Sequence, residues 1–224
     1  MHNILVCNAH FVPFTIDRYF IFSTNSNRHL KLLNRNKKIS NKILYNESIN
    51  KNSIYRTVLY MNENLTLKEY SSDYQSQILD LILSIQQDEY NIPISKEDQP
   101  DLLNIESVYQ SGNGNFLVAL YQGEVVGTIA LLDIGNRRVA LRKMFVKKEF
   151  RGKIFQTASL LLHNTIAWAK TKEIKEIYLG TTLQFVAAHR FYEKHHFENI
   201  EPDKLPANFP VMQVDKKFYK YIVS

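Results

Sequence analysis

A candidate phosphate-binding turn is the strongest chemical signal in this sequence. Arg151, Gly152 and Lys153 follow an apolar run and precede a stretch with helical periodicity. A glycine-containing turn that opens a helix leaves several backbone N–H groups unpaired and directed at one point, where the helix dipole also favours negative charge. The two cationic side chains add positive charge at the same place. The sequence therefore predicts an anion site at this turn.

The elements around the turn predict a sheet before it and a covering helix after it. Residues 116–121, 124–132 and 139–146 are rich in Val, Leu, Ile and aromatic residues, and Gln122-Gly123 and Gly135-Asn136 separate them. This pattern predicts a three-stranded antiparallel meander. After the turn, apolar and small residues at spacings of four, three and four predict a helix that packs on the sheet: Ala158, Leu162, Thr165 and Ala169.

The segments that follow complete a mixed sheet. A short strand at 176–179 and a helix at about 187–194 come after the covering helix. A strand, a covering helix and a returning strand form a right-handed parallel crossover. The apolar segment 218–223 is expected at the edge of the sheet. The predicted fold class is α/β, with a central mixed, mostly antiparallel sheet flanked by helices.

Two helices are predicted ahead of the meander. Residues 71–73 offer capping side chains for the first, and its apolar residues share one helical face: Ile78, Leu81, Ile82 and Ile85. The second is expected to begin near Lys96, to accept Pro100 in its first turn and to run towards Tyr109. A run rich in Gly and Asn at 111–115 ends it.

Residues 1–60 differ in composition from the rest of the chain. They hold nine Lys or Arg against two acidic residues, a net charge of +7, whereas residues 61–224 hold 19 cations against 20 anions, a net charge of −1. All seven glycines lie after residue 60, and no helical or strand period is sustained before it. We therefore expect a basic, Asn- and Lys-rich extension at 1–60 and a domain at 61–224.

The extension has three interpretations. Either Met61 is the working start and the leading segment is a mis-assigned extension, or that segment is a poorly ordered arm. An arm that binds nucleic acid or an acidic membrane surface is the third interpretation. It is disfavoured because Lys and Arg alternate with Asn and do not gather on one face.

The N-terminal residues also bear on location. Cys7 is the only cysteine, so the chain alone forms no internal disulfide and no cysteine-based metal site. The apolar stretch 11–22 contains a proline and two charges and is too short to span a bilayer. The first three residues lack the basic start of a secretory signal. The expected location is the cytoplasm.

Three pieces of the chain, in this order, resemble the GNAT superfamily of acyl-CoA-dependent N-acetyltransferases, over roughly residues 65–221. They are the strand 141–146, the turn 151–156, which is similar to the Gln/Arg-x-x-Gly-x-Gly/Ala loop, and the helix carrying Ala188 and Tyr192, on to Phe197. The resemblance implies that acetyl-CoA is the acyl donor, that the strand pairs with its pantetheine arm and that the loop holds its pyrophosphate. The implied cofactor-binding residues are Met144, Phe145, Val146, Arg151, Gly152, Lys153, Ile154, Phe155, Gln156 and Thr157.

Some positions depart from the superfamily pattern. Ile154 and Gln156 replace small residues that let the backbone approach the pyrophosphate, so weaker cofactor binding is expected. His196 stands where a glycine often ends the helix. Ala140 stands where an acidic residue is common. The general base is therefore left unassigned.

The resemblance also implies a mechanism. The amine attacks the acetyl thioester directly in a ternary complex, and Cys7 lies outside the domain, which disfavours a cysteine acyl carrier. A backbone N–H within 143–146 is expected to stabilise the oxyanion. Tyr192 is expected to protonate the departing thiolate, the alternative being an aromatic residue that only packs.

The residues that would bind or deprotonate the acceptor amine are less clearly indicated by the sequence. Arg142 and Lys143 are expected on opposite faces of one strand; Arg142 either holds a carboxylate of the acceptor or is a solvated surface arginine. Asp101 is a second candidate for acceptor binding. Asp101, Glu106 and Glu89 are candidate bases, each with a surface carboxylate as the alternative. The histidines lack metal-ligand spacing and are expected on the surface, so no metal is predicted: His163, His189, His195 and His196.

Four segments also resemble a narrower bacterial group of uncharacterised GNAT proteins, without implying an acceptor: 97–101, 141–146, 179–182 and 205–215. The expected partner is a small-molecule or peptide amine, with no membrane or nucleic acid, and a homodimer is common among similar proteins. The rival function is a non-catalytic acyl-CoA-binding or regulatory domain that keeps the phosphate turn. A nucleic-acid-binding module is the weaker third function, because the domain is near neutral.

Overall fold

The computed structural model describes residues 19–23, 29–34, 43–44 and 64–224. The chain divides into two units, Met1–Arg56 and Thr57–Ser224. In the first unit, three strands form an antiparallel sheet in the order β1 (Tyr19–Ser23), β2 (His29–Asn34), β3 (Ile43–Leu44). The sequence did not predict these strands. Cys7 and the proposed start Met61 lie outside the described residues, and the 60/61 boundary stays a prediction.

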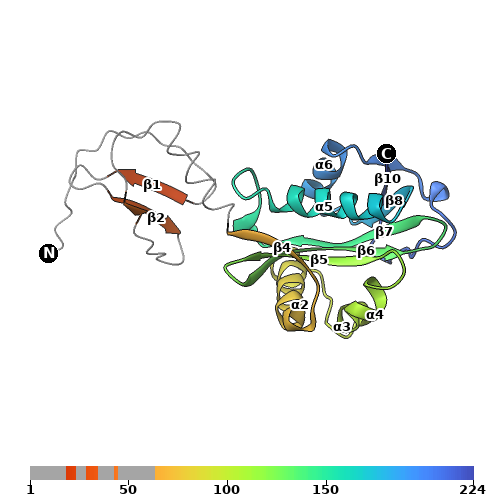
Figure 1. Ribbon diagram of the computed structural model, residues 1–224, viewed down its shortest axis with the longest axis horizontal. Coiled ribbons are helices and arrows are strands. Elements are labelled where there is room, and N and C mark those ends of the chain that lie inside the picture. Colours follow the sequence, from red (N-terminus) through yellow and green to blue (C-terminus); the bar gives the residue numbers. More distant parts are fainter. Residues whose placement is uncertain (1–18, 24–28, 35–42, 45–63) are drawn as a thin grey trace. The chain divides into compact units, whose positions relative to one another are not determined.

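The second unit is built on a seven-stranded sheet in the order β4-β5-β6-β7-β8-β10-β9. Only β7 and β8 run parallel; the other neighbours are antiparallel, as predicted for a mixed sheet. Figure 1 shows this sheet between two layers of helices. The strands are β4 (Leu65–Glu69), β5 (Asn115–Tyr121), β6 (Glu124–Asp133), β7 (Arg138–Val146), β8 (Glu176–Thr181), β9 (Glu198–Ile200) and β10 (Lys217–Ile222).

The predicted meander is confirmed as β5, β6 and β7, but the predicted edge strand is wrong. β10 lies inside the sheet, because the three-residue strand β9 pairs with its residues Phe218 to Lys220. Both β4 and β9 were missed. A strand as short as β9, with two exposed polar residues, carries no alternating pattern long enough to be detected.

Helices cover both faces of the sheet. On one face lie α2 (Gln75–Ser84), α3 (Pro100–Leu103) and α4 (Ile105–Tyr109), and on the other lie α5 (Thr157–Thr171) and α6 (Val186–Lys194). The first predicted helix is confirmed, entered by η1 (Ser72–Tyr74) and extended by the π-helical turn η2 (Ile85–Glu89). The second predicted helix is wrong as one element. It splits at Asn104, whose φ of −135° and ψ of 45° are not helical.

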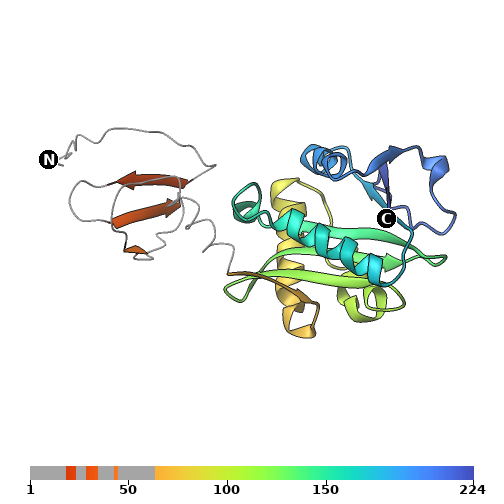
Figure 2. The same ribbon diagram turned by 45° about the horizontal axis from the view of Figure 1, so that its top comes forward.

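The core consists of apolar layers on the two faces. Ile78, Ile82 and Phe116 are fully buried between α2 and the sheet, and Leu161 and Leu162 are fully buried under α5. Figure 2 shows α5 lying across the strands. Each buried side chain of this size contributes about 1.5–3 kcal/mol relative to exposure. The burial of Leu161 and Leu162 therefore anchors the start of α5 on the sheet, next to the candidate phosphate-binding turn.

Gly127 of β6 allows α5 to approach the sheet closely. A Cβ atom at this position would lie 3.0 Å from Cδ1 of Leu161 and 3.2 Å from Cγ2 of Thr157. These distances are shorter than ordinary van der Waals contact between carbon atoms. A side chain here would push away the N-terminal half of the helix.

Two irregularities in β7 shape the centre of the unit. β7 and β8 pair only from Arg138–Glu176 to Ala140–Tyr178 and then diverge, so within 64–224 the rest of β7 has no strand partner on that side. In addition, Thr128 pairs with Phe145 and Ala130 pairs with Arg142, which leaves two β7 residues opposite one β6 residue. This is a β-bulge, and its first residue, Lys143, has a φ of +50°.

Candidate active site

The phosphate turn has the backbone geometry of an anion site. Gly152 has a φ of +88°, and Gln156 has a φ of +51° immediately before α5. The first helical hydrogen bond is donated by Leu160 N–H to Gln156 O, at 2.9 Å. The N–H groups of the three preceding residues, 157–159, therefore stand at the free N-terminus of a 15-residue helix.

The side chains of the turn contribute unequally. The Arg151 guanidinium pairs with both carboxylate oxygens of Glu89, at 2.8 and 3.0 Å, and its Nε donates to Val146 O at 2.6 Å. Lys153 is exposed. The Arg151 side chain is thus held between the Glu89 carboxylate of η2 and the carbonyl of Val146 at the end of β7. Lys153 is the cation of the turn that remains in solvent.

Other predicted cofactor contacts of the turn are available only through the backbone. Phe155 is buried, with its ring 4.6 Å from that of Phe150 and 5.5 Å from that of Tyr121. Thr157 is fully buried, and Ile154 packs against the same core. Their side chains fix the turn on the sheet and leave their amides to face a ligand.

Tyr192 of α6 lies against the part of β7 that has no strand partner on the β8 side within 64–224. Its hydroxyl lies 3.5 Å from Sδ of Met144, and its ring contacts those of Phe197 and Tyr219. The side chain is only 6% exposed, and burial raises the pKa of the Tyr192 hydroxyl above that of an ordinary tyrosine. The hydroxyl therefore remains a proton donor at neutral pH.

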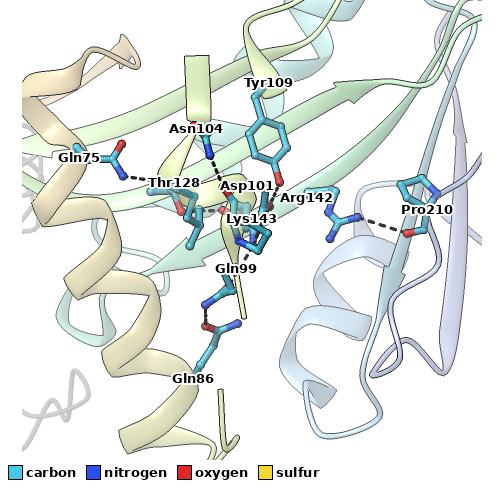
Figure 3. Close-up of polar contacts among 12 residues, drawn as sticks. Gln75, Gln86, Gln99, Asp101, Asn104, Tyr109, Thr128, Arg142, Lys143 and Pro210 are labelled. Carbon is cyan, nitrogen blue, oxygen red and sulfur yellow. Dashed lines mark hydrogen bonds and ion pairs between the residues drawn. The ribbon is translucent and has the colours of Figure 1, made fainter. Parts of the chain in front are cut away.

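On the opposite face of the sheet, the bulge residue Lys143 joins a buried polar network. Its Nζ lies 3.0 Å from Oδ2 of Asp101 and donates to Oε1 of Gln99 at 2.9 Å. Tyr109 donates its hydroxyl to the same Asp101 oxygen, and Gln99 donates to Gln86. Figure 3 shows these side chains converging from η2, the N-terminal end of α3, α4 and β7.

The charges in this network hold one another. Burial alone would raise the pKa of Asp101, but the Lys143 cation, the Tyr109 hydroxyl and the nearby Arg142 together hold that pKa below its ordinary value. Burial lowers the pKa of Lys143, and Asp101 opposes that shift. Asp101 is therefore a paired anion with little affinity for a proton.

The expectation that Arg142 and Lys143 face opposite sides of the sheet is wrong. The bulge breaks the alternation of β7, so the two adjacent cations both act on Asp101. Arg142 Nη1 donates a 3.4 Å hydrogen bond to Pro210 O, and Arg142 forms no ion pair with any residue in 64–224. In Figure 3 its guanidinium points towards Pro210 and away from the Lys143 network.

The segment between β9 and β10, residues 201–216, completes this side of the site. Asp215 lies directly on Gly180 of β8, where a Cβ atom would be 2.5 Å from its Oδ2. Arg142 acts electrostatically on Asp215. The four segments that resemble a narrower bacterial group thus contribute neighbouring residues to one face of the sheet.

The carboxylates expected as bases differ in their surroundings. Glu89 is paired with Arg151, Asp101 is paired with Lys143, and Glu106 is exposed. Asp215 was missed, because only the tail resemblance pointed to its segment. The histidines were expected on the surface, which is wrong for His189: it is 9% exposed, and its Nε2 lies 2.9 Å from Thr182 O.

A separate cavity of about 690 Å³ lies between α2, η2 and the β5–β6 turn. Carboxylates outnumber lysines in its lining, which includes Asp80, Asp88, Glu89, Glu124, Glu149, Lys147 and Lys148. This negative lining repels polyphosphates, so the turn before α5 remains the candidate cofactor site.

The described residues, 19–23, 29–34, 43–44 and 64–224, lack two further features. None of the helices in this part of the chain has the length and apolar composition needed to cross a membrane. Nor do the described residues bring three His, Cys, Asp or Glu side chains together as a metal site.

The chain is similar to known acetyltransferases in both sequence and structure. Residues 79–197 match the family model described as Acetyltransferase (GNAT) family. A crystal structure of a GNAT-family acetyltransferase from Staphylococcus aureus Mu50 is 38% identical, with a TM-score of 0.69, and covers 71% of this chain and 99% of that one. Streptothricin acetyltransferase A from Bacillus subtilis (strain 168) is 29% identical over 136 residues, 60% of this chain and 77% of that protein.

N-acetylaspartate synthetase from Danio rerio is 36% identical over 102 residues, 45% of this chain. The match covers 36% of that protein, so this chain spans about a third of its length. Because the family model spans more than half of this chain and the Staphylococcus aureus structure matches over almost its whole length, the chain belongs to the GNAT family of acetyltransferases.

Proposed function

We propose that this acetyltransferase moves an acetyl group from acetyl-CoA to a primary amine by direct attack in a ternary complex. The observation that carries the proposal is the buried Tyr192 hydroxyl, 3.5 Å from Met144 Sδ beside the unpaired edge of β7. Family membership supports an acyl-CoA donor and argues against a non-catalytic role.

Each residue has one task in the proposed reaction. The pyrophosphate binds the backbone amides that open α5, with Gly152 and Lys153 beside them. The pantetheine arm pairs with β7 along Met144 to Val146, where β8 has diverged. Ile154, Phe155 and Thr157 contribute backbone amides, whereas the Gln156 N–H already donates to Gly152 O at 3.1 Å and holds the turn closed. Arg151 keeps the turn on β7 through Val146 and exchanges part of its contact with Glu89 for the cofactor.

The chemical step needs a nucleophile, an oxyanion donor and an acid. The amine nitrogen bonds to the thioester carbonyl carbon, and the carbonyl oxygen gains negative charge. A backbone N–H within the bulged segment 143–146 donates to that oxygen, since a bulge removes a peptide from the ladder. The carbon–sulfur bond then breaks, and the thiolate takes the proton of Tyr192.

On the acceptor side, Arg142 is proposed to bind a carboxylate. It is a partly buried guanidinium with no ion pair within 64–224 and is suited to a bidentate contact. N-acetylaspartate, the product that one relative is named for, carries carboxylates. Asp101, whose Oδ2 accepts from Lys143 and Tyr109, would offer an acceptor only its other oxygen.

The test combines binding with turnover. Acetyl-CoA at a hundred times its dissociation constant should stabilise the protein by about 2.7 kcal/mol, a rise in Tm of roughly 5–10 °C, with adenosine diphosphate as the control for pyrophosphate binding alone. Release of the free thiol of CoA is then followed with a panel of amines that includes L-aspartate, L-glutamate, L-lysine and spermidine. Stabilisation without turnover of any amine would favour the non-catalytic alternative.

Replacing Tyr192 by Phe separates chemistry from packing. The variant keeps the ring contacts with Phe197 and Tyr219 and loses only the hydroxyl. With an accepted amine, kcat should fall by about 10²-fold or more while the acetyl-CoA thermal shift is kept. Unchanged kcat at saturating acetyl-CoA would remove Tyr192 from the mechanism.

A further inference from the structure

We propose that Asp215 is the general base that removes the proton from the acceptor ammonium. The assignment rests on the proposed function, because it needs an amine acceptor. It supplies the one chemical role that neither the sequence nor the resemblance assigned.

The position of Asp215 follows from strand register. Ala140 of β7 and Tyr178 of β8 are the last paired residues before the strands diverge. Arg142 and Gly180 each lie two residues further along their strands, on the same face as that last pair, because side chains alternate along a strand. Asp215 lies on Gly180, with Arg142 acting on it across the divergence. Its carboxylate therefore faces the bulged stretch of β7.

Because Gly180 has no side chain, the Asp215 carboxylate can lie directly against β8. Any side chain at Gly180 would meet Asp215, since a Cβ atom would lie 2.5 Å from Oδ2 and 2.6 Å from Cγ. Oδ2 accepts a hydrogen bond from Met212 N–H at 3.0 Å, which fixes the side chain. In residues 64–224, Oδ1 has no hydrogen-bond partner. One oxygen is thus held and the other is open to an ammonium.

The surroundings of Asp215 suit proton uptake better than those of the other acids at the site. Half-burial raises the pKa of Asp215 above the ordinary value, and Met212 N–H, Arg142 and Lys216 only partly oppose the shift. β8 contributes no charge here, because the contacting residue is Gly180. By contrast, the pKa of Asp101 is held low by Lys143. A base works best when its pKa approaches the working pH.

The proposed step balances as follows. An Asp215 oxygen takes one proton from R–NH3⁺, which frees the nitrogen lone pair to bond to the thioester carbon. The tetrahedral adduct then carries R–NH2⁺ and an oxyanion. A second nitrogen proton passes to solvent, the carbon–sulfur bond breaks, and the sulfur receives the proton of Tyr192. The products are R–NH–acetyl and CoA thiol. Nitrogen has released two protons, one to Asp215 and one to solvent. One of these two protons reprotonates Tyr192, and the other is the net proton that the reaction releases.

The test is Asp215→Asn in the full-length protein, with Asp203→Asn as the matched control. Asp203 belongs to the same segment but is exposed, and within 64–224 its one ion pair is with Lys204. The amide introduced by D215N keeps an oxygen for Met212 N–H, so the fold is retained. With the amine that the wild type accepts best, kcat at pH 7 should fall by about 10²–10⁴-fold in D215N and stay unchanged in D203N.

The pH profile separates a base from a structural residue. Wild-type kcat should rise along a limb set by Asp215, whereas in D215N the rise should move to alkaline pH, towards the pKa of the free amine. Gly180→Ala is the second variant: it keeps Asp215 but displaces its carboxylate, and kcat should fall as well. Its thermal unfolding shows whether the fold survives.

The outcomes separate the two proposals. If D215N or G180A turns over the amine with the wild-type rate and pH profile, Asp215 is not the base, and the acetyltransfer proposal stands. If the wild type acetylates none of the amines despite binding acetyl-CoA, the proposed function is overturned, and the base assignment falls with it.

Discussion

At the residue scale, Gln156 carries the clearest departure from a typical phosphate turn. Its φ of +51° is a left-handed conformation that suits glycine, and in the proposed cofactor site its side chain stands where backbone would approach the pyrophosphate. We expect Gln156→Gly to stabilise the protein by about 0.5 kcal/mol, the relief of strain being partly offset by the entropy of glycine. Acetyl-CoA should also bind several-fold more tightly, which isothermal titration would measure.

Gln122 provides the control for this change. It has nearly the same φ, +52°, but lies in the β5–β6 turn beside Gly123. Gln122→Gly should give a similar stability change and leave the affinity for acetyl-CoA unaltered. Equal affinities in Q156G and the wild type would show that the glutamine does not crowd the cofactor.

At the element scale, the bulge in β7 sets what faces the acceptor. The run 141–146 predicts an uninterrupted strand, and alternation then puts Arg142 and Lys143 on opposite sides. The observed register breaks this rule, because the hydroxyl of Thr128 donates to Lys143 O at 2.7 Å and Ile129 faces two residues of β7. Propensity revealed the strand, but its bulge depends on contacts with β6 and α3 that local sequence does not encode.

The Lys143–Asp101 pair joins this strand to α3. Lys143→Met removes a cation whose side chain is 8% exposed and leaves the Asp101 carboxylate without its main partner. Loss of one partner of a buried pair costs about 3–5 kcal/mol, and we expect the lower end because Asp101 keeps 24% exposure. A double-mutant cycle with Asp101→Leu, followed by urea unfolding, isolates the pair; additive losses would show that the two residues are not coupled.

The same pair gives a pH dependence with a defined sign. The folded pKa of Asp101 is below its ordinary value of 3.8. The contribution of the ionised Asp101 carboxylate to the free energy of unfolding is therefore complete above pH 3.8. This contribution is lost as the pH falls through the lower, folded pKa of Asp101. The stability difference between the wild type and K143M should be constant from about pH 5 to 8 and shrink in acid. A difference that stays constant down to pH 2 would contradict the assigned pairing.

At the scale of the whole molecule, the sequence predicted element types better than the assembly of the site. Apolar composition and turn residues located the meander, apolar spacing located α5, and the resemblance of residues 188–192 located α6. The contact between Asp215 and Gly180 joins residues 35 apart, and Asp215 lies in the segment 201–216, where the three-residue helix η4 (Pro202–Lys204) is the only regular element, so no period predicts its position. The strands of 19–44 were missed for a similar reason, since Asn and Lys obscure any alternation there.

The division of the chain predicts that residues 61–224 act without the basic extension. All residues assigned to the site lie in Thr57–Ser224, and residues 61–224 are nearly neutral, whereas residues 1–60 carry a net charge of +7. A chain shortened to 61–224 should keep kcat/KM and the acetyl-CoA thermal shift of the full-length protein within about twofold, a difference of about 0.4 kcal/mol, and should elute earlier from a cation-exchange column. A tenfold loss of kcat/KM with an unchanged Tm would show that the basic N-terminal unit takes part in binding the acceptor or the cofactor.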